Sequence, residues 1–408
     1  MGAQPTADGS PATTARRGSG AYRRISLALF LAGFATFSLL YCVQPLLPAF
    51  SADFRVGPAE SSLALSLSTG FLALAILGAA AVSERVGRRG LMLVSMFAAA
   101  AFNIAAAVAP GWPLFLTARA LEGIALGGVP AVAMAYLAEE IHPDGLGLAM
   151  GLYVGGTAFG GMIGRVAAGI LTELSSWRMA LGAIGVIDLV AAVGFFALLP
   201  RSRNFTRRSL SASDHWRAWG VHLNHPALPS LFAIGFLVMG AFVTVYNYAG
   251  FRLMAPPYDL DQTKVGLIFT VYLFGIAASS LAGAQADRLG RGPVLLAGVV
   301  VAGTGLAMTL VHPLAGIVSG VIVFTVGFFI AHSVASGWVG RMASSSKGHA
   351  ASLYLLAYYL GSSLMGSVGG WFWGWGGWPA VAGFTAVLLA LALVAALRLQ
   401  SLERSPRP

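Results

Sequence analysis

Four charged side chains lie deep inside long apolar stretches of this sequence, namely Arg119, Glu122, Arg165 and Asp188. Charges surrounded by hydrocarbon are costly, so each requires a compensating partner or a function. Arg119 and Glu122 are three residues apart and share one face of a helix, where they partly neutralise each other. Burial favours the neutral form of a carboxyl and a neighbouring arginine favours its charged form. Glu122 is therefore a candidate carrier of a coupling proton tuned by Arg119; the alternative is a structural buried ion pair.

Arg165 is open to two interpretations. A guanidinium near the middle of an apolar helix either binds an anionic or polyhydroxyl substrate, or pairs with an acid such as Glu122. The sequence alone favours neither of these two interpretations.

The stretches that must position these charges dominate the chain. Hydrophobic residues make up 57% of it and charged residues 10%, and the mean hydropathy is +0.78. So few polar side chains would not cover a water-soluble surface, and we expect an all-α membrane protein. Twelve stretches of about twenty residues are predicted transmembrane helices: 25–50, 61–82, 91–109, 114–137, 146–171, 178–199, 228–251, 265–286, 294–311, 314–339, 350–370 and 378–397.

Two short basic segments mark an internal repeat. SERVGRRG at 83–90 follows the second stretch, and ADRLGRG at 286–292 follows the eighth. Their matching glycines, Gly87 and Gly290, are separated by about half of the 408 residues, which predicts two pseudo-symmetric six-helix bundles. The glycine in each segment allows a turn that a side chain would hinder.

The predicted domains follow from these segments. We expect a disordered cytoplasmic tail at 1–23, the N-terminal bundle at 24–199, a cytoplasmic linker at 200–227, the C-terminal bundle at 228–398 and a cytoplasmic tail at 399–408.

The basic residues indicate how the chain is oriented in the membrane. Outside the helices they fall on the side of the two termini, with the exceptions of Arg55, Arg178, Arg252 and Lys264. The positive-inside rule then places both termini in the cytoplasm. The net charge of +10 therefore reflects membrane orientation, and we expect no nucleic-acid partner.

The sequence carries no motif for other kinds of chemistry. The sequence has no P-loop, no His-Glu-x-x-His motif and one cysteine, Cys42, so we expect no enzyme, no metal site and no cofactor. A membrane-embedded enzyme or lipid-handling protein would need a nucleophile and a base near one membrane face. A receptor-like sensor would need a soluble output domain, for which the linker and tails are too short.

Twelve helices in two halves, with a Gly-Arg segment after the second and the eighth, resemble the major facilitator superfamily. LYCVQP at 40–45, AEEIHP at 138–143 and AHSVAS at 331–336 look like the YnfM-type inner-membrane transporters of its drug/proton antiporter branch. Glu84 stands where the family usually has Asp.

The antiporter signature of the fifth helix is only partly present. Its glycine spacing is kept at Gly147, Gly156, Gly160 and Gly164, but Gly161 replaces Pro and Arg165 replaces a final Gly. Small residues four apart allow close helix approach, so we expect this stripe to pack between the two halves.

The resemblance implies rocker-switch alternating access around a cavity between the bundles. Arg119 and Glu122 resemble the fourth-helix motif that the antiporter branch links to proton transfer, and for Asp188, on the usually peripheral sixth helix, a structural partner is favoured. The expected cavity residues are Tyr41, Gln44, Tyr153, Arg165, Tyr246, Asn247, His332, Tyr354 and Tyr358.

A gate is expected at the cytoplasmic ends of the helices, where an acid at the end of helix two pairs with arginines. The alternative is a set of solvated topology anchors of little energy. The gating residues are Glu84, Arg85, Gly87, Arg88, Arg89, Glu139, Glu140, Asp287, Arg288, Gly290 and Arg291.

The predicted function is secondary active transport, as proton-coupled export of small organic molecules such as drugs or sugars. A proton symporter or a uniporter importing sugars or organic acids is the alternative, because direction depends on gradients. We expect a monomer in the bacterial inner membrane whose partners are the bilayer, its substrate and protons, with the proton gradient as energy source.

Overall fold

The computed structural model describes residues 14–205, 212–343 and 346–404. Over these residues the chain forms helices and connecting turns, with one isolated β-bridge between Ala15 and Ile141. The predicted all-α class is therefore confirmed.

The helices form two groups. The N-terminal group consists of α1 (Gly20–Tyr41), α2 (Leu47–Phe54), α3 (Pro58–Ser61), α4 (Leu63–Val86), α5 (Arg88–Ala107), α6 (Trp112–Leu126), α7 (Ala133–Glu140), α8 (Pro143–Leu174) and α9 (Trp177–Leu198). The C-terminal group consists of α11 (Leu228–Met254), α12 (Gln262–Leu267), α13 (Tyr272–Leu289), α14 (Arg291–Met308), α15 (Leu314–Met342) and α16 (Lys347–Arg404). Between them in the chain lies α10 (Ala212–Leu223), and two 3₁₀ segments, η1 (Gln44–Leu46) and η2 (Ile268–Val271), interrupt the groups.

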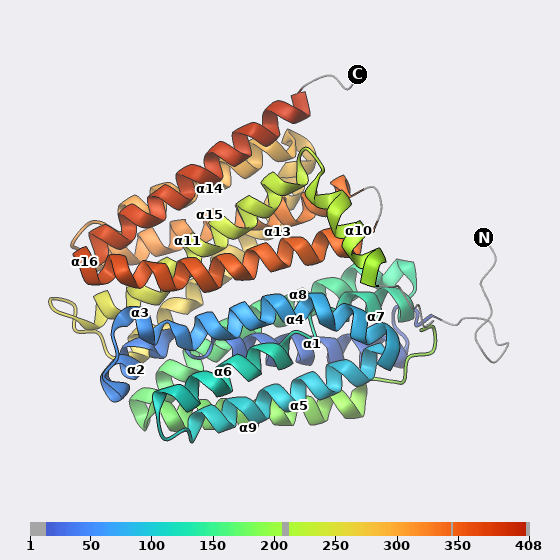
Figure 1. The fold of residues 1–408 in the computed structure, drawn as a ribbon, viewed down its shortest axis with the longest axis horizontal. Helices are drawn as coiled ribbons and strands as arrows, with labels where there is room; N and C mark the ends of the chain where they lie inside the picture. The colour runs from blue at the N-terminus through green and yellow to red at the C-terminus, as the bar shows by residue number, and fades with distance from the viewer. Residues whose placement is uncertain (1–13, 206–211, 344–345, 405–408) are drawn as a thin grey trace.

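These helices account for twelve membrane passes. Ten described helical segments are long and apolar enough to cross a bilayer. The helix α16 supplies two of the twelve passes, because Gly376 and Gly377 leave helical geometry and the chain turns back on itself there (Figure 1). A further pass is formed by α6 and α7, which the turns at 127–132 separate. A continuous fourth helix was predicted, so this interruption is a correction.

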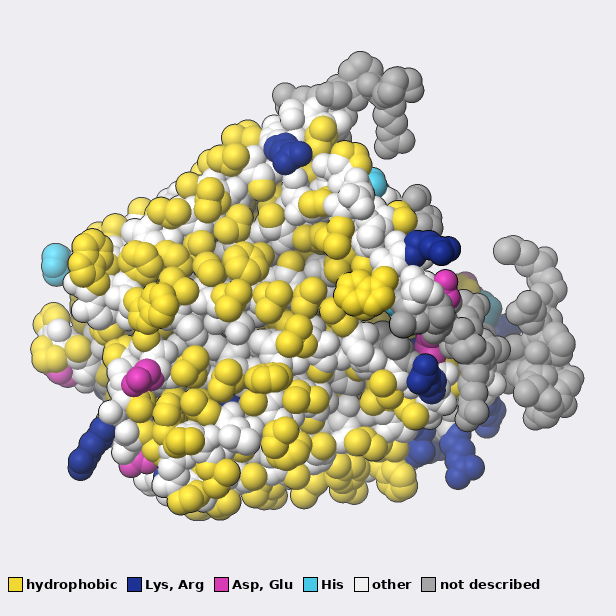
Figure 2. All heavy atoms as spheres, in the orientation of Figure 1, with side chains coloured by type: hydrophobic (Ala, Val, Ile, Leu, Met, Phe, Trp, Pro, Cys, Tyr) yellow, Lys and Arg dark blue, Asp and Glu magenta, His cyan; other side chains and the backbone are white. Residues whose placement is uncertain are grey.

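The two ends of the molecule differ in charge. The turn between α4 and α5, the turn between α13 and α14, the C-terminus of α7 and the helix α10 lie at one end, called the basic end here, and α2 and α3 lie at the opposite end (Figure 1). On the face drawn in Figure 2, most Lys and Arg side chains gather at the basic end, and apolar side chains cover the flank between the ends. Large apolar side chains such as Val94, Val190 and Leu281 are 68%, 66% and 68% exposed, as a lipid-facing surface requires.

The tight packing of α8 lies within the N-terminal group. A Cβ atom added at Gly156 or Gly160 would lie 2.4 or 2.1 Å from the backbone oxygen of Phe30 or Phe34 on α1. Gly164 faces Ser38 of the same helix, whereas Gly147 faces open space. The prediction that this stripe packs between the halves is therefore wrong, because its glycines fit against the backbone of α1. Further along α8, Gly169 does contact Gly266 of the C-terminal group.

Both predicted tails are shorter in the structure than in the sequence analysis. Ala15 exchanges backbone hydrogen bonds with Glu140 and His142, and α1 begins at Gly20, where the Ser19 hydroxyl accepts from the Tyr22 amide. At the other end, α16 continues to Arg404. The predicted tail residues 1–13 and 405–408 lie outside the described residues.

Hydrogen bonds join the two groups near the opposite end. Ser363 donates to the Ser66 carbonyl (2.7 Å), and Gln262 donates to the Pro45 carbonyl (2.5 Å). The backbone amide of Gln262 also donates to Glu173 (2.9 Å). The described conformation is therefore closed at this end.

Candidate functional site

A fully buried ion pair lies inside the N-terminal group. Arg119 and Glu122 are both 0% exposed, and Arg119 Nη1 donates to Glu122 Oε2. This pair was predicted from the spacing of the two residues along α6. Arg119 also donates through Nε to the Ala64 carbonyl (2.9 Å).

The same guanidinium holds the end of α1. Arg119 donates to the carbonyls of Leu39 (3.4 Å) and Leu40 (3.1 Å), where α1 ends before the 3₁₀ segment η1. These are carbonyls of the last turn, which lack a complete set of helical partners and carry the negative end of the helix dipole. The arginine therefore stabilises the break in the first membrane pass, and a change in the charge of Glu122 would alter how firmly it does so.

A second buried acid belongs to this region. Asp188 of α9 is 1% exposed, and neither of its carboxylate oxygens has a hydrogen-bond partner among the described residues. Glu122 Oε1 also lacks a partner. The structural role predicted for Asp188 stays a prediction. Two carboxyls and one guanidinium buried together leave one negative charge uncompensated unless a proton is bound.

Arg165 of α8 lies in a second cluster, where the groups meet. Its Nε donates to Gln44 Oε1 (2.7 Å), and Gln44 Nε2 donates to Asn247 Oδ1 of α11 (2.8 Å). Its Nη1 donates to the Gly161 carbonyl (2.8 Å). The pair between Arg165 and Glu122, one of the two interpretations left open by the sequence, is not formed in this structure, because Glu122 is held by Arg119.

Aromatic rings surround the Arg165 guanidinium. Its carbon lies 4.0 Å from the centre of the Tyr41 ring, 5.0 Å from that of Phe269 and 4.9 Å from that of Tyr272. These distances are typical of cation–π contacts. Phe269 and Tyr272 lie in and directly after η2, so both 3₁₀ segments contribute to this cluster.

A third cluster lies between α15 and α16. His332 Nδ1 is 2.9 Å from the Tyr354 hydroxyl, and the His332 ring lies 4.7 Å from the Tyr358 ring. His332 also stacks on Phe328. The predicted pairing of Tyr354 and Tyr358 on one helix face is consistent with these contacts.

Of the remaining predicted cavity residues, Tyr246 borders the Arg165 cluster and Tyr153 lies elsewhere on α8. The Tyr246 hydroxyl is 2.6 Å from Thr325 Oγ1, and its ring packs 5.0 Å from Phe269. Tyr153 is 5% exposed on α8. Sequence reasoning missed Asn103, which accepts from Arg119 (3.3 Å), and also Phe269 and Tyr272. A lone polar group inside an apolar stretch was the available signal for Asn103 and Tyr272.

At the basic end, charged contacts of the N-terminal group stay within that group. Arg88 pairs with Glu139 (2.9 Å) and donates to Ser83 Oγ (2.5 Å), whereas Arg89 donates to the Leu199 carbonyl (2.9 Å). Glu140 accepts from Ser202 and from the backbone amides of Arg203 and Asn204. Of the expected partners, Glu139 pairs with an arginine and Glu140 holds the chain that follows α9.

The second copy of the basic segment is similar. Asp287 pairs with Arg291 (3.0 Å) and with Arg341 (3.2 Å), again within one group. Gly87 and Gly290 have φ of 90° and 87°, values that favour glycine. Among the described residues, Glu84, Arg85 and Arg288 form no ion pair within 4.0 Å. The gating role of these residues stays a prediction.

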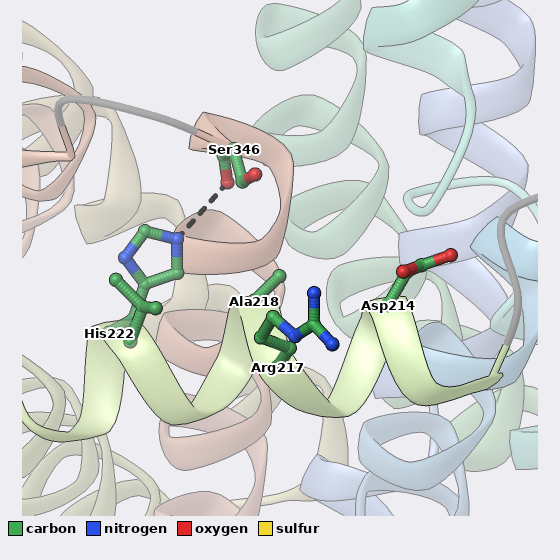
Figure 3. Close-up of a pocket in the computed structure, with 6 residues that line it drawn as sticks. Asp214, Arg217, Ala218, His222 and Ser346 are labelled. Carbon is green, nitrogen blue, oxygen red and sulfur yellow. Dashed lines mark hydrogen bonds between the residues drawn. The ribbon is translucent and has the colours of Figure 1, made fainter.

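Two surface pockets lie at the basic end. One, of about 230 Å³, is lined by α10 and Ser346, where His222 is directed at the Ser346 carbonyl (3.3 Å) and Asp214 lies toward the other end of α10 (Figure 3). The other, of about 260 Å³, is lined by the turn at Gly87 and by Arg201, Ser202 and Phe205. The part of the chain that the structure describes contains no group of three His, Cys, Asp or Glu side chains placed to hold a metal ion.

Twelve apolar passes with buried charges between them define the class of the molecule as a polytopic membrane transporter. The sequence model of the Major Facilitator Superfamily matches residues 29–260 and 237–408. The chain therefore belongs to this superfamily.

Individual relatives agree with this assignment. The chain is 44% identical to the inner membrane transport protein YnfM of Escherichia coli (strain K12), covering 98% of this chain and 99% of YnfM. It is also 44% identical to the MFS-type transporter YybF of Bacillus subtilis (strain 168), covering 93% and 94%. The crystal structure of a mutant of the nucleoside transporter NupG superposes with a TM-score of 0.75 at 13% identity, covering 92% of this chain and 99% of NupG. These named relatives are transporters and not enzymes.

Proposed function

We propose that this protein is a proton-coupled exporter of small organic molecules that works by rocker-switch alternating access. The observation that carries the proposal is the buried pair Arg119–Glu122, whose arginine also holds the carbonyls of Leu39 and Leu40. An ion pair with no access to water needs a reason in a membrane protein, and proton transfer is one such reason.

The coupling route is short. Leu40 is followed directly by Tyr41, whose ring packs on Arg165, and Gln44 accepts from Arg165. When Glu122 binds a proton, Arg119 loses its ionic partner and binds the α1 carbonyls differently. Tyr41 and Gln44 then move relative to Arg165, which links protonation to the cavity side chains. Asp188 is the second acid in the proton site, because its oxygens lack other partners.

The proposal of alternating access rests on the position of the contacts between the N-terminal and C-terminal groups of helices. The two groups are held together near the opposite end, by bonds such as Ser363–Ser66 and Gln262–Pro45. With the basic end in the cytoplasm, as the positive-inside rule requires, this conformation is closed to the outside. In the complementary state the basic segments at Gly87 and Gly290 would approach each other and form the cytoplasmic gate.

The remaining features of the proposal follow from this placement. The protein acts in the bacterial inner membrane, with both termini in the cytoplasm, as a monomer driven by the proton gradient. No nucleic acid, metal or organic cofactor takes part. The alternative is a symporter or uniporter that imports sugars or organic acids, which uses the same proton site or none.

The test is proton movement in proteoliposomes that contain a pH-sensitive dye. Candidate drugs, sugars and organic acids are added to vesicles with the wild type, Glu122→Gln or Glu139→Gln. We expect substrate-dependent proton flux in the wild type and its loss in Glu122→Gln. Glu139→Gln makes the same chemical change at the basic end and should retain the flux.

The outcomes separate the alternatives. Outward substrate movement against inward proton movement supports export, and movement of both in one direction supports the symporter. Substrate movement without proton flux in the wild type would establish the uniporter. Equal proton flux in the wild type and Glu122→Gln would remove Glu122 from the mechanism.

A further inference from the structure

Arg165 is a buried cation without an anionic partner. Its side chain is 2% exposed, and no carboxylate oxygen of the described residues lies within 4.0 Å of its nitrogens. The other buried arginine of the bundle, Arg119, has Glu122. A guanidinium taken out of water is expensive unless an opposite charge compensates it, and cation–π contacts compensate it in part only.

The donor and acceptor directions of the hydrogen bonds around Arg165 determine which polar atoms are left without a partner. A guanidinium only donates, so Gln44 must present its oxygen to Arg165 and its NH₂ to Asn247. Asn247 must then present its oxygen to Gln44, which leaves Asn247 Nδ2 without a partner. Asn247 is 1% exposed, so this orphan donor is buried. It lacks a partner because Arg165 can only donate and so fixes the orientation of both amides.

A second orphan lies on the C-terminal group's side of the same guanidinium. The Tyr272 hydroxyl also lacks a hydrogen-bond partner, and Tyr272 is 5% exposed with its ring against the guanidinium. Buried donors without partners are rare in native proteins, and each one calls for an explanation. An arginine, an amide NH₂ and a hydroxyl together match the acceptor-only oxygens of a carboxylate.

The side chains around Arg165 restrict the class of ligand further. One guanidinium balances one negative charge, and the walls of Tyr41, Phe269 and Tyr272 are aromatic. A strongly hydrated inorganic anion would lose more water against these rings than the three donors replace. An organic anion places its carboxylate on Arg165 and its apolar part against these rings.

We propose that Arg165, Asn247 and Tyr272 form a binding site for a small organic monocarboxylate. The inference rests on the proposed transport function and names its substrate class. The arginine lies in the N-terminal group, and the two orphan donors lie in the C-terminal group. The bound carboxylate therefore bridges the two groups, and its arrival and release are linked to their relative movement.

The most informative variant places a negatively charged side chain of the protein itself beside Arg165. Gln44 Oε1 already lies 2.7 Å from Arg165 Nε, so Gln44→Glu places a carboxylate there with almost no change of shape. Asn247 can turn its amide and donate its unused NH₂ to the second oxygen. We expect Gln44→Glu to raise the melting temperature of the ligand-free protein and to abolish anion binding.

A second variant tests the orphan hydroxyl. Tyr272→Phe removes no hydrogen bond from the ligand-free protein, so its melting temperature should stay unchanged. Its affinity for carboxylates should fall by on the order of tenfold, because a hydrogen bond to a charged ligand is lost. Tyr136→Phe is the matched control, since this hydroxyl donates to the Pro200 carbonyl (3.1 Å) after the end of α9. The control should lose stability and keep its affinity.

The experiment measures thermal unfolding of the purified full-length protein with benzoate or hexanoate, each compared with its neutral amide. We expect the carboxylates, and not benzamide or hexanamide, to stabilise the wild type, and Gln44→Glu to remove this effect. The proposal is overturned if neither carboxylate stabilises the protein, if the amides do so equally, or if Gln44→Glu lowers the ligand-free melting temperature.

Failure of this site and failure of the proposed transport mechanism give different results. If the carboxylates bind through Arg165 but cause no proton flux in proteoliposomes, the site stands and proton coupling fails. If only neutral or cationic compounds cause proton flux, and Gln44→Glu retains it, proton coupling stands and the carboxylate site fails.

Discussion

Replacing Gly160 by alanine should separate α8 from α1. The added Cβ would lie 2.1 Å from the Phe34 backbone oxygen, whereas non-bonded atoms pack best at about 3.5–4.0 Å. The helices must therefore move apart by roughly 1 Å or more, and overpacking of this kind costs about 1–3 kcal/mol. Gly147→Ala is the matched control on the same helix, because its Cβ would meet nothing within 4 Å. It should stabilise the protein by about 0.5–1 kcal/mol through a lower helix-formation cost.

The same displacement should reach the cavity. Arg165 lies on α8 a little more than one turn after Gly160, and its 2.7 Å bond to Gln44 would not survive a shift of this size. The assay is thermal unfolding of both purified variants together with their substrate-dependent proton flux. We expect Gly160→Ala to lose stability and flux and Gly147→Ala to keep both. Equal melting temperatures for the two variants would refute the packing argument.

Three further predictions concern other parts of the chain. Burial and, next, the neighbouring His222 lower the pKa of His225, whose Nδ1 accepts from the amides of Ala227 and Leu228 at the start of α11. Below about pH 6.5 the His225 imidazole binds a proton more readily in the unfolded chain than in the folded protein, so the stability of the protein should fall as pH drops. His225→Asn keeps an acceptor and should flatten the melting-temperature profile between about pH 7.5 and 5.5. An unchanged slope would contradict this prediction. Asp188→Asn should stabilise the protein at about pH 8 by about 1–3 kcal/mol, because it removes a buried carboxylate without partners. The measurement is the melting temperature, which should rise. A lower melting temperature would show that the carboxylate has a partner in the folded protein. Arg88→Gln should cost at most about 1 kcal/mol in the same assay, since its ion pair is partly exposed; a larger loss would indicate a structural role.

Local patterns predicted much of the fold and part of the site. Long apolar stretches identified the membrane passes, since a bilayer dictates both their length and their composition. The spacing of Arg119 and Glu122 predicted their ion pair, because the helix itself brings them together. The glycines at 87 and 290 predicted the turns for the same local reason.

The errors concern contacts between residues that are distant in the chain. Gly156 and Gly160 were expected to pack between the halves, but a glycine spacing says only that some helix approaches, and α1 is that helix. The partners of Arg165 outside α8 come from two other passes, the first with Tyr41 and Gln44 and the eighth with Phe269 and Tyr272, and nothing in the local pattern of α8 specifies them. The 3₁₀ segment η1 was missed because Gln44 and Pro45 lie within an otherwise continuous apolar stretch.

The central claim is that Glu122 carries the coupling proton, and its most direct test compares two transport modes in proteoliposomes. One is accumulation of a substrate driven by an imposed pH gradient, and the other is exchange of labelled for unlabelled substrate without a gradient. Exchange needs the cavity to alternate with substrate bound, whereas accumulation also needs the proton to bind and leave. We predict that Glu122→Gln retains exchange and loses accumulation. Accumulation equal to that of the wild type in Glu122→Gln would contradict the account.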